Sequence, residues 1–82
     1  MNDSRIAMIA IVVQDPSSVE KLNALLHEYS RFIIGRMGIP YKEKNLSLIS
    51  IAIDASEEDI NALTGSLGRL EGITVKAAFA KV

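Results

Sequence analysis

An unbroken apolar segment near the start of the chain constrains the fold more than any other feature. Residues 5–13 read Arg-Ile-Ala-Met-Ile-Ala-Ile-Val-Val, a run too short for a lone buried helix and rich in β-branched side chains. We therefore predict a strand. Because side chains alternate between the two faces of a strand, both faces of this one are apolar. A single layer of helices can cover only one of them, so the other face needs a further partner.

The segment that follows this strand combines a helix signal with strand signals. Asp15 precedes Pro16 and is placed to act as the N-cap of a helix. Apolar residues then recur every three or four positions, which predicts an amphipathic helix of about four turns; they are Val19, Leu22, Leu26, Tyr29 and Ile33. Two glycines and a proline within residues 33–41 predict an irregular or edge strand, and the charged residues 42–45 predict a hairpin tip.

The second half of the chain repeats the same order of elements. Residues 46–54 alternate as a strand does, and Ser56 with the acidic residues 57–59 resembles the capped start of a helix. The buried side of that helix is predicted to comprise Ile60, Leu63, Leu67 and Leu70. Gly72 ends it, and residues 73–79 form a last strand. The order β-α-β-β-α-β predicts an α+β ferredoxin-like plait, with a four-stranded antiparallel sheet and two helices on one face.

Composition limits the kinds of function that this fold can carry. The chain has 82 residues, 49% of them apolar, a net charge of -1 and no cysteine. We expect one domain over residues 1–82, without disulfides or a Cys-ligated metal. The near-zero charge argues against direct nucleic-acid binding, because non-specific binding needs a basic surface. No apolar run approaches the ~20 residues of a membrane span, so we expect no membrane partner and a cytoplasmic location.

Few residues suggest chemistry, and none suggests catalysis. Asp15, Ser17 and Ser18 surround the start of the first helix, where backbone N–H groups can accept an anion or a carboxylate, and they are the best candidate ligand site. Local capping hydrogen bonds are the alternative reading. Asp54 also follows a strand, and we expect it near Asp15 at one edge of the molecule. His27 is the only histidine and cannot make a transition-metal site alone, although copies of it could meet between subunits of an oligomer; a solvent-facing histidine is the simpler interpretation. Because no catalytic constellation is present, we expect no enzyme, metal or cofactor.

Several segments resemble one known family. These are Leu26-His27-Glu28-Tyr29, residues 62–68 and above all Ile33-Ile34-Gly35-Arg36-Met37-Gly38-Ile39-Pro40-Tyr41, and they are similar to the iron-only hydrogenase system regulators. That resemblance implies an ACT-like ferredoxin fold, close to the C-terminal domain of the nickel-responsive repressors. Those repressors hold metal through several histidines and a cysteine, whereas this chain has His27 alone. The amino-acid-binding ACT pattern Asp-x-Pro-Gly is only loosely echoed by residues 15–18.

The resemblance and the two-faced strand together predict a non-enzymatic regulatory or ligand-sensing module that acts as a homo-oligomer, either a dimer or a tetramer. Its expected partner is a small-molecule effector bound at Asp15, Ser17 and Ser18. The alternative is an adaptor without a small ligand, which binds a hydrogenase-maturation protein through a strand edge or a sheet face.

Overall fold

The computed structural model describes residues 4–82 and has the predicted order of elements. Short 3₁₀ turns at Pro16–Ser18, Ser30–Phe32 and Lys42–Lys44 join some of them. The main elements are β1 (Ser4–Val13), α1 (Val19–Glu28), β2 (Ile33–Tyr41), β3 (Leu46–Ser56), α2 (Glu57–Gly68) and β4 (Ile73–Phe79). The ferredoxin-like βαββαβ prediction is therefore confirmed.

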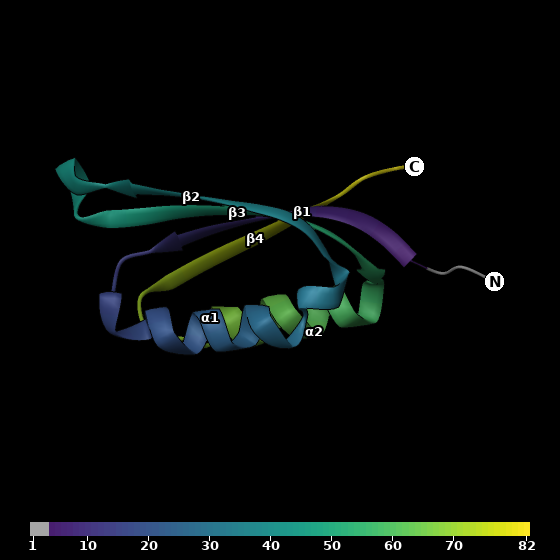
Figure 1. Cartoon of the computed structure of the whole chain (residues 1–82), viewed down its shortest axis with the longest axis horizontal. Coiled ribbons are helices and arrows are strands. Elements are labelled where there is room, and N and C mark those ends of the chain that lie inside the picture. The colour runs from purple at the N-terminus through teal and green to yellow at the C-terminus, as the bar shows by residue number, and fades with distance from the viewer. Residues whose placement is uncertain (1–3) are drawn as a thin grey trace.

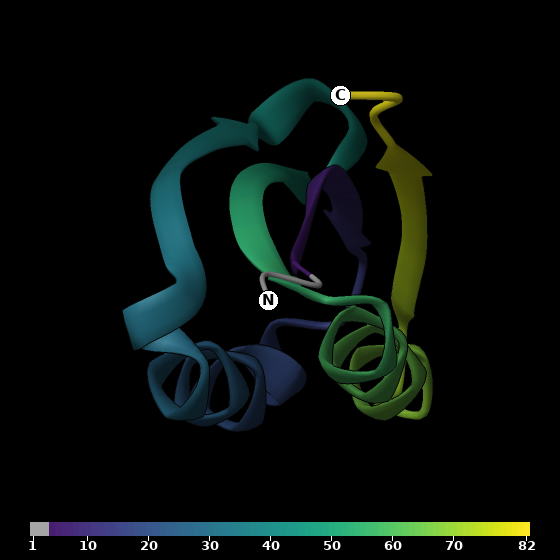
Figure 2. The same cartoon turned by 90° about the vertical axis from the view of Figure 1, so that its right-hand side faces the viewer.

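The four strands form one antiparallel sheet in the order β2-β3-β1-β4. Both helices lie on the same side of it, and no helix of residues 4–82 covers the opposite side (Figure 1). Seen along the molecule, α1 lies under the β2 side of the sheet and α2 under the β4 side (Figure 2). This open side of the sheet is called the open face below.

The two apolar faces of β1 have different surroundings, as expected: one faces the helices and the other does not. Ala7, Ile9, Ile11 and Val13 point toward the helices and are at most 4% exposed. They pack with the inward residues of β3 and the buried stripe of α2, of which Ile60, Leu63 and Leu67 are fully buried. The alternate residues of β1 lie on the open face, where Met8 is 50% exposed. The helices thus cover one face of the sheet and leave an apolar face uncovered.

The first helix is shorter than predicted. It ends at Glu28, its C-cap is Tyr29, and a 3₁₀ turn follows before the chain enters β2 at Ile33. Ile33 pairs with Ile53 across β3, so sheet pairing takes this residue away from the helix. The apolar spacing continues past Glu28 because a 3₁₀ turn also buries every third residue, and Tyr29 and Phe32 both pack against the core.

The prediction of an irregular or edge strand over residues 33–41 is confirmed. β2 pairs only with β3, and an irregularity in the register falls between Ile33 and Gly35. No residue of β2 is buried on either face. Its apolar side chains stay in contact with solvent, among them Ile34 at 63% and Met37 at 59% exposed. This strand is held by backbone pairing more than by packing.

Candidate functional site

The turn between β1 and α1 brings two of the three predicted site residues into direct contact. Asp15 caps the 3₁₀ turn, and its Oδ1 accepts hydrogen bonds from the Ser17 backbone N–H at 2.9 Å and from Ser17 Oγ at 2.8 Å. These two bonds, the side-chain one first, favour the charged carboxylate and lower the pKa of Asp15 below its usual 3.8. Asp15 is therefore an anion with its charge partly neutralised by the turn.

Ser18 is placed differently, because it ties this turn to the one between α2 and β4. Its side chain is buried, and Oγ donates to the Glu71 carbonyl at 2.7 Å. The Gln14 N–H donates to the neighbouring Gly72 carbonyl, also at 2.7 Å. The capping bonds expected as the alternative reading are thus present between Asp15 and Ser17, whereas Ser18 makes no side-chain cap bond and instead ties the turn to Glu71. Whether a ligand uses these residues stays a prediction.

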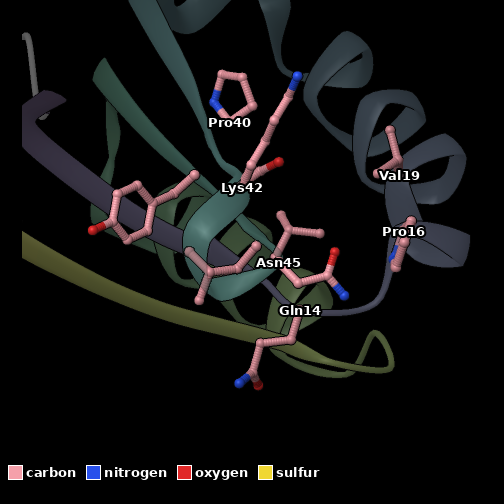
Figure 3. A pocket seen from close by; sticks show the side chains of 10 residues that line it. Gln14, Pro16, Val19, Pro40, Lys42 and Asn45 are labelled. Atoms are coloured by element: carbon pink, nitrogen blue, oxygen red, sulfur yellow. The ribbon is translucent and has the colours of Figure 1, made fainter.

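A hollow of about 190 Å³ opens beside this turn (Figure 3). Pro16 and Val19 form one wall, and Pro40, Lys42 and Asn45 of the β2–β3 hairpin lie across from them. The lining residues do not include Asp15, Ser17 or Ser18. Sequence reasoning pointed to the neighbouring turn and proposed none of the residues that line this hollow as site residues. The missing information was the register of β3 on β1, which pairs Ser47 with Val13 and brings the hairpin tip to this end.

Two further hollows continue the first along α1. One of about 180 Å³ shares Val13, Val19, Pro40 and Ser47 with it, and another of about 270 Å³ adjoins at Asn23 and Arg36. Together they make a furrow with α1 as one wall and β2 as the other, which we call the α1–β2 groove. Its lining residues are those of the three hollows: Val13, Gln14, Pro16, Val19, Leu22, Asn23, Leu26, His27, Ser30, Ile33, Arg36, Gly38, Ile39, Pro40, Tyr41, Lys42, Asn45, Leu46, Ser47 and Ile49.

The expected proximity of Asp15 and Asp54 is wrong. β1 and β3 are antiparallel, so their carboxyl ends lie at opposite ends of the sheet, and Asp54 is opposite Ile6 at the far end from Asp15.

His27 lies at the Ser30 end of the α1–β2 groove. Within residues 4–82, no three His, Cys, Asp or Glu side chains gather as metal ligands do. No helix in this part of the chain is long and apolar enough to cross a bilayer.

Comparison with known proteins gives a family match and several matches of fold. The family model "TM1266-like: Iron-only hydrogenase system regulator, putative" matches residues 5–77. The structure of TM1266 from Thermotoga maritima is 33% identical, with a TM-score of 0.91, and the match covers 95% of this chain and 99% of that one. Among curated proteins, none matches the sequence.

More distant structures share the fold alone. CPII, a nitrogen regulatory PII-like protein from Thiomonas intermedia, is 15% identical in its apo form, with a TM-score of 0.62 over 95% of this chain and 91% of that one. The same protein bound to ADP, AMP and bicarbonate is 15% identical, with a TM-score of 0.50 over 93% of this chain and 94% of that one.

The family match spans nearly the whole described fold and includes β2 with its Ile33–Tyr41 segment. The chain therefore belongs to the TM1266-like family of iron-only hydrogenase system regulators.

Proposed function

We propose that this protein is a non-enzymatic, cytoplasmic ligand-sensing regulator that acts as a homo-oligomer and serves an iron-only hydrogenase system. The observation that carries the proposal is the rigid turn at Asp15, Ser17 and Ser18 beside an open groove, in a chain whose family is described as regulatory. A turn that is already ordered loses little conformational freedom on binding, which favours a small effector at this end of the molecule.

The fold is compatible with sensing. CPII, which shares it, is a regulatory protein whose structure holds ADP, AMP and bicarbonate. For the present chain, these three ligands only guide the choice of compounds to test. The expected likeness to the nickel-responsive repressors stays a prediction, and with it the dimer or tetramer inferred by analogy.

A thermal-shift screen tests the sensing proposal. The compounds are amino acids, adenine nucleotides, bicarbonate and divalent metals, since a ligand that binds only the native state raises the melting temperature by mass action. A positive compound is then tested on Asp15→Asn and Ser17→Ala, with Asp54→Asn at the far end of the sheet as the matched control. We expect the first two variants to bind more weakly and the control to bind normally. A screen in which no class shifts the melting temperature contradicts the proposal.

An adaptor function is the second candidate, and the open face favours it. Met8, Ile39 and Leu48 are 50%, 47% and 39% exposed there, on three neighbouring strands. Such a surface fits a protein partner as well as a second copy of the chain. Affinity purification from an organism that makes the protein separates the two functions. A stoichiometric maturation protein whose capture is lost in Met8→Glu supports the adaptor, and a retained small molecule supports the sensor.

A further inference from the structure

We propose that the α1–β2 groove binds a small organic anion, with its phosphate or carboxylate at Arg36 and its apolar body against Val19 and Ile49. The inference deepens the proposed sensing function, on which it rests, by naming the chemical class of the effector and a site beyond the Asp15 turn. It follows from the charge of the groove, from the surroundings of Arg36 and from the small residues on the β2 wall.

The charge of the groove has one sign. The charged residues of its lining are Arg36 and Lys42, and within residues 4–82 the lining contains no Asp or Glu. The protein as a whole carries a net charge of -1, so this is a local concentration of basic groups on a slightly acidic molecule. A furrow lined by basic groups attracts anions and holds them more strongly than a flat surface does.

Arg36 is available for such a ligand. The only salt bridge within residues 4–82 joins Arg5 to Glu57, so Arg36 has no carboxylate partner. Its Nη2 donates one long hydrogen bond across the groove, at 3.4 Å, to Asn23 Oδ1 on α1. A guanidinium has five N–H donors and matches a phosphate or a carboxylate with two parallel bonds. A bound anion would therefore replace a weak contact with a stronger, charge-assisted one.

The β2 wall is built from residues that leave the groove open. Gly38 and Pro40 follow Arg36 on the same side of the strand. A Cβ added to Gly38 meets no atom within 4 Å, so neither packing nor a clash within the chain requires glycine there. Glycine weakens a strand interior and marks sites that a ligand or another backbone approaches closely. The apolar side chains of Val19 and Ile49 line the same hollow and accept the uncharged part of a ligand.

NMR titration of the ¹⁵N-labelled protein tests this proposal with three probes: AMP, adenosine and pyrophosphate. AMP carries both an anionic group and a flat apolar body, adenosine lacks the charge, and pyrophosphate lacks the body. We expect AMP to shift amide signals of residues 19–27 and 36–40 saturably and to bind about tenfold or more tightly than adenosine, with pyrophosphate between them. Arg36→Gln should weaken AMP binding by about tenfold, whereas Arg69→Gln at the C-cap of α2 should leave it unchanged.

A second pair of variants separates a binding role from a structural one. Gly38→Val fills the groove and adds a residue that strands favour, so we expect AMP binding to be lost without a fall in melting temperature. Gly35→Val is the matched control, because its Cβ also meets nothing within 4 Å and its partner Ala52 places it on the open face.

Three results would overturn the inference. They are equal affinity for adenosine and AMP, unchanged AMP binding in Gly38→Val, and an absence of shifts with all three probes at millimolar concentration. A fourth result, shifts confined to residues 14–18, would also overturn the groove site while leaving the sensing proposal intact, since it would place the effector at the Asp15 turn alone.

Discussion

At the scale of single residues, Gly72 controls the geometry of the candidate site. Its φ is +67°, and a Cβ there would lie 2.5 Å from Asp15 Cβ and 2.9 Å from the Asp15 backbone nitrogen. Gly72→Ala therefore combines a left-handed backbone with a clash, and we expect it to lower the free energy of unfolding by about 2 kcal/mol or more. Urea denaturation measures this.

The control for that variant is Gly65→Ala, in the interior of α2. There the nearest atom to an added Cβ is Arg69 Nη1 at 3.8 Å, the end of a flexible side chain. Alanine is the better helix residue, so we expect this variant to be more stable by about 0.5–1 kcal/mol. A Gly72→Ala protein as stable as the wild type would contradict the close packing of Gly72 against Asp15.

Asp15 gives a second prediction at this scale, which concerns pH. Its pKa is lowered by the two hydrogen bonds from Ser17, so its contribution to stability is present above the unfolded pKa and is lost as pH falls through the folded one. Ser17→Ala removes the hydroxyl donor and keeps the backbone N–H. We expect the Asp15 pKa, measured by NMR titration of its carboxyl, to rise in this variant and to remain below 3.8. An unchanged pKa would contradict the hydroxyl contact.

At the scale of elements, the N-cap of α2 is the most direct test of the sequence reading. Ser56 Oγ accepts the Asp59 N–H at 3.0 Å, as the pattern of a serine followed by acidic residues predicts. Ser56→Ala should destabilise the protein by about 1 kcal/mol, with Ser66→Ala later in the same helix as the control. Thermal or urea unfolding of both variants measures the difference. Equal stability would show that the acidic first turn alone starts the helix.

The elements that could be predicted from sequence are those whose local pattern and tertiary role agree. β1 is an unbroken apolar run, β3 and α2 have clear apolar periodicity, and the structure has all three close to where the sequence places them. The end of α1 could not be found in this way, because the spacing of Tyr29 and Ile33 fits a helix as well as the turn and strand that the sheet imposes. The pairing of Ile33 with Ile53 decides where the helix gives way to the strand, and this pairing is a long-range contact.

The capping hydrogen bonds of the candidate site could be predicted from sequence, whereas the α1–β2 groove beside it could not. Asp15 and Ser17 are two residues apart, so their hydrogen bonds follow from local turn chemistry. The α1–β2 groove instead joins residues 13 to 49, and its existence depends on how far α1 stands from an edge strand. The one available signal was the two glycines and the proline in residues 33–41, which indicated an irregular or edge strand.

At the scale of the whole molecule, the open face carries exposed apolar side chains on three neighbouring strands, β2, β3 and β1. Met37, Ile39 and Tyr41 on β2 are level with Ser50, Leu48 and Leu46 on β3, and β1 adds Met8 beyond them. The exposed fractions of Met37, Ile39 and Tyr41 are 59%, 47% and 38%. Exposed apolar side chains on an edge strand make a surface on which other chains pair or pack. A second copy offers the same surface in return, so a two-fold symmetric contact would cover both at once.

Replacing two of these side chains by charges tests the association. We expect the wild type to run as a dimer or tetramer at micromolar concentration in light scattering, and Met37→Glu with Ile39→Glu to run as a monomer. Because β2 has no buried residue, the monomer should keep the far-ultraviolet circular dichroism of the wild type. Asn61→Glu with Ala62→Glu, two exposed residues of α2, adds the same charge on the helical side and should leave the assembly intact. A monomeric wild type would contradict the prediction, and so would dissociation in the α2 control, because burial of the open face would then not be what holds the copies together.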